Sequence, residues 1–195
     1  DPEVGEAVLE QGKADLIAFG RQLLADPEMP KKVSEGRAAE VRKCIACCQG
    51  CIDELFQDHP ITCTVNPRTG FEKEFTFERA PKPRKVLVIG GGPAGMEAAR
   101  VAALRGHHVT LWEKAGNLGG QLNLATVPPQ KGEIATFTEF LTGELARLKV
   151  NVATGKAATL DAVKTEGPDA VVVATGAIPA TIGSPGAEGG NVATA

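Results

Sequence analysis

The chain has 195 residues, 43% of them hydrophobic and 23% charged, which indicates a folded globular protein of one or two domains. A net charge of −3, without a lysine- and arginine-rich stripe, leaves no electrostatic basis for nucleic-acid binding. The longest apolar run, residues 170–174, is far shorter than the ~20 residues that span a bilayer, so no membrane contact is expected. The chain does not open with a secretory signal, and a cytoplasmic protein is therefore expected.

The first 37 residues are predicted to form helix, strand and helix. A helix over 3–11 ends at Gly12, and the glycine-bounded apolar run 14–20 indicates a buried strand. A second helix is expected over 23–34. A single buried strand cannot pair its own backbone, so residues 1–37 are interpreted as the tail of a larger α/β domain.

Residues 38–80 show little periodicity but contain all five cysteines, at positions 44, 47, 48, 51 and 63. An odd, tightly clustered set without a secretory signal indicates a metal or cluster site rather than disulfides. In the spacing Cys44-x2-Cys47-x3-Cys51-x11-Cys63, three cysteines are crowded and one is isolated. This pattern favours a [4Fe–4S] cluster over zinc, which usually takes paired knuckles. Cys48 is interpreted as a small buried residue, with replacement of Cys47 or Cys51 left open.

The sequence changes character after residue 80, where a proline-containing linker precedes an alternation of strands and helices. Strands are predicted at 85–89 and 108–113, with weaker ones at 150–153 and near 156–159 and a fully buried one within 169–177. Helices are predicted at 93–105 and 133–148, and a loop at 183–195. This alternation is typical of an α/β domain with a parallel sheet.

The glycine motif Gly90-x-Gly92-x-x-Gly95 follows a predicted strand and opens a predicted helix. In such a motif Gly90 permits the tight turn, Gly92 lets a pyrophosphate approach the backbone, and Gly95 lets helix and strand pack closely. Glu113 ends the second predicted strand, where a carboxylate accepts hydrogen bonds from ribose hydroxyls. The sequence therefore predicts a dinucleotide site. Ala174-Thr175-Gly176 after the last strand resembles the crossover out of the FAD domain in flavoproteins with two dinucleotide-binding domains, and this resemblance favours FAD over NAD.

These segments together resemble bacterial NADH:flavin oxidoreductases that join an old-yellow-enzyme-like barrel to a glutathione-reductase-like module. The family includes 2,4-dienoyl-CoA reductase and trimethylamine dehydrogenase. Residues 14–37, 44–68 and 85–125 carry the resemblance. It implies an α/β fold in three parts: the end of a TIM barrel at 1–37, a cluster-binding segment at 38–80, and an incomplete Rossmann-like FAD domain at 81–195.

The resemblance also implies which residues bind cofactors. FMN-phosphate contacts match Gly20 and Arg21, and the ligands of the [4Fe–4S] cluster match Cys44, Cys47, Cys51 and Cys63. Contacts to FAD or ADP are expected from Gly90, Gly92, Ala94, Gly95, Glu113, Gln121, Lys131 and Ala158. No catalytic acid or base is expected in this chain, because the family keeps those residues in the barrel.

The implied function is part of an electron relay from NAD(P)H through FAD, the cluster and FMN to an unsaturated small-molecule substrate such as a 2,4-dienoyl-CoA or an enone. One alternative is an amine dehydrogenase or demethylase with ADP in the FAD site. Another alternative is a nucleotide-binding module that is held together by structural zinc and has no redox role. The sequence does not indicate the substrate, the direction of electron flow or the oligomeric state.

Overall fold

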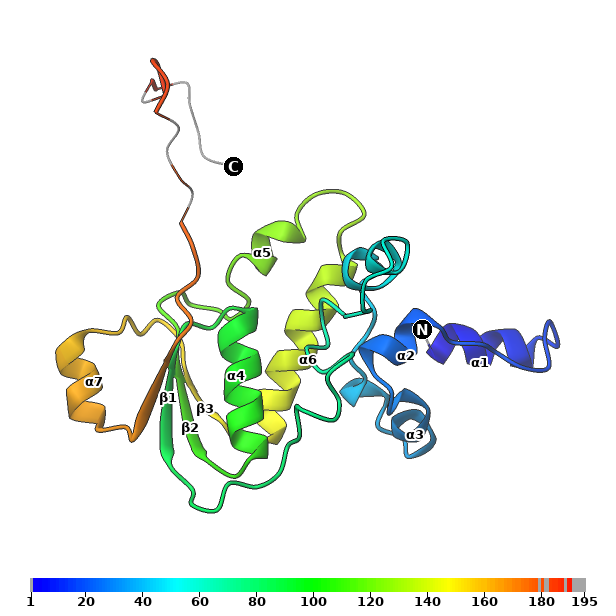
Figure 1. Cartoon of the computed structure of the whole chain (residues 1–195), viewed down its shortest axis with the longest axis horizontal. Coiled ribbons are helices and arrows are strands. Elements are labelled where there is room, and N and C mark those ends of the chain that lie inside the picture. Colours follow the sequence, from blue (N-terminus) through cyan, green and yellow to red (C-terminus); the bar gives the residue numbers. More distant parts are fainter. Residues whose placement is uncertain (1, 179, 181–182, 188, 191–195) are drawn as a thin grey trace.

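The computed structural model describes residues 2–178, 180, 183–187 and 189–190, and it consists of an irregular N-terminal part and an α/β part (Figure 1). The irregular part, residues 2–84, contains only short helices. They are α1 (Pro2–Glu10), α2 (Arg21–Ala25), α3 (Met29–Ser34), the 3₁₀ helix η1 (Ala38–Glu40) and the π-helix η2 (Gln49–Asp53). The loop predicted at 183–195 lies partly outside the described residues.

The strand predicted over residues 14–20 is wrong: these residues have no regular structure, and the side chain of Leu16 is 87% exposed. A strand needs a hydrogen-bonded neighbour. All the sheet pairings of the described residues join strands after residue 84. The apolar run is therefore left unpaired, and its Ile17 and Phe19 are only partly covered, against Gly5 of α1.

The single helix predicted over 23–34 is divided into α2 and α3. Asp26 ends α2 with extended backbone angles (φ −146°, ψ 95°) because the following Pro27 disfavours the helical region at the residue before it. The Asp26 carboxylate then accepts the N–H of Glu28, just before α3 begins. This break becomes important for the site, since it turns the Asp26 side chain toward the cysteine-bearing segment.

The α/β part is built on a four-stranded parallel sheet with the order β3-β2-β1-β4. The strands are β1 (Lys85–Ile89), β2 (His108–Trp112), β3 (Asn151–Ala153) and β4 (Ala170–Val173). The predicted strands at 85–89, 108–113 and 150–153 are thus confirmed, whereas residues 156–159 form no strand. The sequence did not predict the short helices α5 (Leu122–Ala125) and α7 (Leu160–Glu166).

One face of the sheet is covered by α4 (Pro93–Leu104) and α6 (Glu133–Arg147), which lie side by side between the sheet and the N-terminal part (Figure 1). The core between these layers is apolar and includes Val88, Met96, Leu111 and Leu141, which are fully buried. The prediction that β4 is fully buried is wrong, because Val171 and Val173 are 42% and 71% exposed. They point to the face that α4 and α6 leave open, while Val172 packs on the core.

No helix among the described residues is both long and apolar enough to cross a bilayer.

The turn from β1 into α4 is too tight for side chains at two of its glycines. Gly90 has a φ of +111°, and a Cβ there would lie 2.2 Å from the carbonyl oxygen of Ala174. A Cβ on Gly95 would lie 1.9 Å from the carbonyl oxygen of Gly90. Helix α4 therefore touches the end of β1 through backbone alone, which is the packing role that the glycine spacing predicts.

We expect Gly95→Ala to destabilise the protein by about 3 kcal/mol or more, since the methyl group must displace backbone atoms. The matched control is Gly143→Ala in α6, where a Cβ meets nothing within 4 Å. This control should stabilise by about 0.5–1 kcal/mol through helix propensity. Urea unfolding followed by circular dichroism checks both values, and equal effects of the two substitutions would contradict the packing argument.

Candidate functional site

The five cysteines line one pocket. Cys44, Cys47, Cys48 and Cys51 come from one loop and Cys63 from a stretch twelve residues further on, and all five are free thiols. The rest of the wall is formed by Arg21, Leu24, Ile45, Gly50, Thr64 and Val65. The structure thus brings the four predicted ligands together, with Cys48 beside them.

Backbone turns and hydrogen bonds shape this loop. Ala46 and Cys48 both have left-handed backbone angles (φ 53° and 59°), which wrap the chain around the pocket before η2 begins. The carbonyl oxygen of Gly50 accepts both the N–H of Thr62 (2.6 Å) and its hydroxyl (3.2 Å). The loop is therefore fastened directly to the residue before Cys63.

Burial raises the pKa of the Cys63 thiol, and the neighbouring Cys44 and Cys47 add to the rise, although backbone N–H groups of Val65 and Asn66 oppose it. Desolvation disfavours a thiolate that has no cation nearby. Bound metal supplies such a cation, because cysteine ligates as the thiolate.

The donor set fits an iron–sulfur cluster better than a single metal ion. Among the described residues, no three His, Cys, Asp or Glu side chains converge as one ion requires. A zinc site needs its ligands at about 2.0–2.3 Å from one point. A [4Fe–4S] cluster would be held by four cysteine thiolates, which is the residue type and number that the predicted ligands bring to this pocket. His59 is exposed and bonded to Glu54 (2.9 Å), away from the pocket wall.

Gly20 and Arg21, the expected phosphate contacts, lie at the start of α2. Gly20 is the residue before the helix, and the Arg21 guanidinium donates to the Cys48 sulfur (Nη1–Sγ 3.0 Å). This contact could not be predicted from the sequence, because the two residues are 27 positions apart and no sequence motif contains both.

The second site is the glycine-rich loop at the carboxyl end of β1. Gly92 precedes α4, and a Cβ on Gly92 would meet nothing within 4 Å, so its backbone faces open space. Ala94 lies in the first turn of α4, where unpaired N–H groups and the helix dipole favour an anion such as a diphosphate.

Glu113 follows β2 and is only 8% exposed. Its carboxylate accepts the N–H of Gly91 (2.5 Å) and the N–H of Ala115 (2.7 Å). Glu113 therefore pins the glycine-rich loop to the loop after β2, a role that the motif alone does not reveal. A carboxylate has about four acceptor positions, so ribose hydroxyls can still bind.

Of the other predicted contacts, Gln121 is brought to the same edge: its amide donates to the carbonyl oxygen of Ala177, just after β4 (2.9 Å). Lys131 lies two residues before α6 and Ala158 lies between β3 and α7. Within the described part of the chain, no hydrogen bond or ion pair joins either side chain to the glycine-rich loop.

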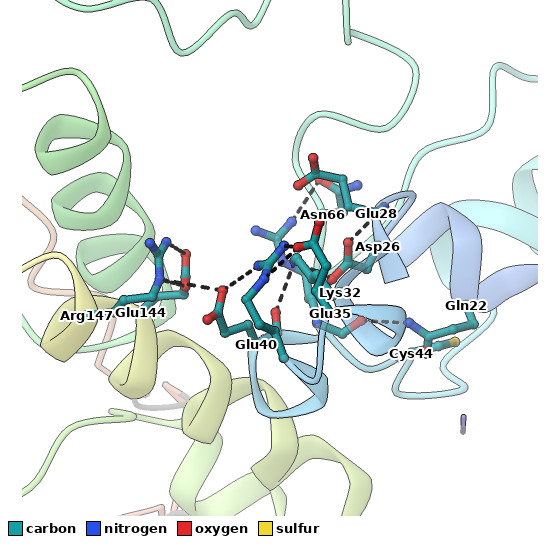
Figure 2. A network of polar contacts seen from close by, with 12 residues as sticks. Gln22, Asp26, Glu28, Lys32, Glu35, Glu40, Cys44, Asn66, Glu144 and Arg147 are labelled. Carbon is teal, nitrogen blue, oxygen red and sulfur yellow. Dashed lines mark hydrogen bonds and ion pairs between the residues drawn. The ribbon is translucent and has the colours of Figure 1, made fainter. Parts of the chain in front are cut away.

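A polar network joins the N-terminal part to α6 (Figure 2). Lys32 pairs with Asp26 (2.7 Å) and donates to the carbonyl oxygen of Glu40 (3.0 Å). The Glu40 carboxylate lies 3.9 Å from Arg147, which pairs with Glu144 one turn earlier in α6 (2.8 Å). Charged side chains thus run from the break after α2 to the end of α6.

A second connection lies deeper. The Arg42 guanidinium stacks over the Phe140 ring of α6 (4.8 Å to the centroid) and donates to the side-chain oxygen of Asn66 (2.8 Å). Burial lowers the pKa of Arg42, but Glu97 of α4 offsets part of this effect. Since Arg42 is only two residues before Cys44, this contact sets the cysteine-bearing loop against α4 and α6.

A parallel sheet with a glycine-rich loop after its first strand and a carboxylate after its second defines a dinucleotide-binding domain of the oxidoreductase type. Residues 84–194, more than half of the chain, match the protein family described as pyridine nucleotide-disulphide oxidoreductase. The chain belongs to this family, and its relatives are NADH:flavin oxidoreductases of the kind that its sequence resembles.

The chain is 47% identical over 190 residues to the NADH oxidase of Thermoanaerobacter brockii, covering 96% of this chain and 29% of that protein. It is 42% identical over 184 residues to the N,N-dimethylglycine/sarcosine dehydrogenase of Chromohalobacter salexigens, covering 92% of this chain and 26% of that protein. The structure of 2-naphthoyl-CoA reductase with 2-naphthoyl-CoA superposes with a TM-score of 0.94 at 38% identity, over 97% of this chain and 29% of that one. The chain therefore spans less than a third of these relatives.

Glu144 provides a pH-dependent test of the network. Burial alone would raise its pKa, but hydrogen bonds and charge from Arg147, with the charge of Arg100, outweigh burial and hold the pKa below its ordinary value of 4.5. The stabilisation of the fold by ionised Glu144 is therefore fully present when the pH is above that ordinary pKa. It is lost as the pH falls through the lower pKa that Glu144 has in the folded protein. At neutral pH, Glu144→Gln should cost about 1.5–3 kcal/mol.

Urea unfolding between pH 3 and pH 7 measures this cost. The difference in the free energy of unfolding between wild type and Glu144→Gln should become smaller toward pH 3. The control is Glu139→Gln on the exposed side of the same helix, which should stay within about 0.5 kcal/mol of wild type. If the difference in the free energy of unfolding between wild type and Glu144→Gln does not change with pH, the stabilisation is not ionic in origin.

Proposed function

We propose that this chain is the electron-relay part of a flavin and iron–sulfur oxidoreductase. The arrangement of the four predicted ligand cysteines around one pocket, beside Arg21 and in the same chain as a dinucleotide-binding loop, carries the proposal. In this proposal residues 1–37 complete a TIM barrel, residues 38–80 hold the cluster and residues 81–195 bind FAD. The barrel and the NAD(P)H-binding part belong to a longer polypeptide, in keeping with the relatives' greater length.

When bound, FAD would supply hydride exchange with NAD(P)H, and the [4Fe–4S] cluster and FMN would supply one-electron transfer. The residues of this chain bind and position these groups. Cys44, Cys47, Cys51 and Cys63 would hold the cluster as thiolates, and Gly20 and Arg21 would bind the FMN phosphate. No side chain here is assigned a proton-transfer role.

The nucleotide would lie across the carboxyl edge of the sheet. The N–H groups of the first turn of α4 would bind the diphosphate, and Gly92 leaves space for it to approach the backbone. Glu113 holds the loop in place and offers its remaining acceptor positions to the ribose. Gln121, Lys131 and Ala158 would complete the contacts.

For the whole enzyme we propose reduction of an unsaturated small molecule such as an enone or a dienoyl thioester. The likeness to 2-naphthoyl-CoA reductase supports this substrate class. The similarity to the dimethylglycine/sarcosine dehydrogenase favours a second candidate function, amine oxidation. In that case ADP would occupy the FAD site. The five free thiols are compatible with the reducing cytosol, which we propose as the compartment.

The first experiment is to measure iron, acid-labile sulfide, zinc and bound nucleotide in anaerobically purified protein. About four iron and four sulfide per chain, with FAD, would support the proposed relay. ADP without flavin would favour the amine dehydrogenase. Zinc without iron would overturn the redox proposal and leave a zinc-stapled nucleotide-binding module.

Single cysteine-to-serine variants should divide into two groups. Substitution of Cys44, Cys47, Cys51 or Cys63 removes a ligand, so cluster absorbance should fall by more than half. Cys48→Ser is the matched control and should keep the cluster, because Cys48 donates toward the carbonyl oxygen of Ala46 and contacts Arg21 instead. Loss of the cluster in Cys48→Ser with retention in Cys47→Ser or Cys51→Ser would reassign the ligands.

Glu113→Ala should weaken nucleotide binding about 10- to 100-fold, because the glycine-rich loop loses its anchor and the ribose loses its acceptor. Isothermal titration of FAD and of ADP into nucleotide-stripped protein measures this loss. Glu139→Ala, an exposed substitution on α6, serves as the control. Unchanged affinity in Glu113→Ala would show that the nucleotide binds elsewhere.

A further inference from the structure

Helix α2 directs two neighbouring side chains to the cysteine-bearing loop. Arg21 contacts Cys48, and Gln22, only 8% exposed, lies against the stretch that leads into Cys44. The Gln22 side-chain oxygen accepts the N–H of Cys44 (2.9 Å), and its amide nitrogen donates to the carbonyl oxygen of Arg42 (2.9 Å). Figure 2 shows Gln22 beside Cys44 with the bond drawn.

Both ends of the Gln22 amide are satisfied, and the partners determine its orientation. A backbone N–H can bond only the oxygen end, and a carbonyl can bond only the nitrogen end. The Gln22 side chain therefore supplies the hydrogen-bond partners that a neighbouring strand supplies in a sheet. Without it, the N–H of Cys44 and the carbonyl of Arg42 would lack these partners.

Other bonds tie α2 to the stretches around both ends of the ligand set. Asp26, at the end of α2, accepts the N–H of Arg42 (2.9 Å). The carbonyl oxygen of Leu24 accepts from the Asn66 amide (2.9 Å) and the Thr69 hydroxyl (2.8 Å), just after Cys63. One five-residue helix thus holds the segment that precedes Cys44 and the segment that follows Cys63.

We propose that Gln22 is a positioning residue for the cluster ligand Cys44. Because Arg21, the proposed FMN-phosphate contact, lies in the same helix, α2 thereby keeps Cys44 at a fixed position relative to Arg21. The inference rests on the proposed function. Gln22 also occupies the Cys44 N–H and keeps it from donating to a cluster sulfur. Hydrogen bonds to sulfur help to set cluster potentials, because they stabilise the more negative reduced state.

The test uses Gln22→Leu, which keeps the size of the side chain and removes both hydrogen bonds. The protein is purified anaerobically with its cluster, and three quantities are measured: the electron paramagnetic resonance spectrum of the reduced cluster, its midpoint potential, and the rate of iron release to a chelator. We expect an altered spectrum, a higher potential because the Cys44 N–H is released, and about 10-fold faster iron release.

Two further variants separate positioning from a general loss of stability. Gln57→Leu is the matched control: Gln57 lies in the same N-terminal part, is exposed, and donates its side-chain amide to the carbonyl oxygen of Asp53, so all three quantities should match wild type. Gln22→Glu keeps an acceptor for the Cys44 N–H but turns an oxygen toward the Arg42 carbonyl, so its iron-release rate should lie between those of Gln22→Leu and wild type. If Gln22→Leu does not fold, Gln22→Asn, one methylene shorter, should shift the potential in the same direction.

A wild-type spectrum, potential and release rate in Gln22→Leu, or in Gln22→Asn if it replaces that variant, would overturn the inference while leaving the cluster in place. Wild-type protein that binds no iron–sulfur cluster would overturn the proposed function and this inference together. The wild-type measurement therefore distinguishes the two failures before any variant is compared.

Discussion

The hydrogen bonds between α2 and the two cysteine-bearing stretches hold the N-terminal part of this protein together. Residues 41–48 and 59–63 have no regular secondary structure that could pair their backbone groups. Buried backbone groups must nevertheless find partners. Gln22 and Asp26 bond the backbone before Cys44, and Asn66 and Thr69 bond back to α2. The shape of the cysteine pocket therefore depends on a few side chains rather than on a sheet or a long helix.

The α/β part is stabilised in a different way. Its strands pair through regular backbone ladders, and an apolar layer packs α4 and α6 on one face. At the glycine-rich loop a side chain bonds the backbone instead, because the Glu113 carboxylate accepts the N–H of Gly91 and the N–H of Ala115. A buried carboxylate placed there keeps the loop open and in one shape before any nucleotide binds, which reduces the ordering cost of binding.

The two parts meet through ion pairs, a cation–ring contact and apolar packing, since Ala25 and Val65 belong to the same buried core as residues of α4 and α6. A cavity of about 420 Å³ lies between them, with charged residues such as Lys32, Arg42 and Glu144 in its wall. Partly buried ion pairs add little net stability but depend strongly on geometry. Arg42 is near Cys44 in sequence and stacks on α6, so the contact that joins the two parts is also close to the proposed cluster. Such an arrangement suits a relay, in which the separation of two redox groups must stay constant.

The sequence by itself determined the β1–loop–α4–β2 unit and the clustering of the cysteines. Both are local: apolar periodicity, glycine spacing and ligand spacing act over a few residues, and the strands and α4 lie where they were predicted. Contacts between distant residues could not be predicted in this way. Only the tertiary structure showed that Gln22 bonds Cys44, that Arg21 reaches Cys48 and that Glu113 binds backbone groups.

Two of the wrong predictions have the same physical reason. Residues 14–20 and the outer face of β4 are apolar, and apolar runs predict burial, but burial requires a partner surface. In the described residues that surface is missing, so residues 14–20 form no strand and Val173 stays exposed. An amino-acid pattern determines what a segment can pair with or cover, whereas the tertiary structure decides whether the partner is there.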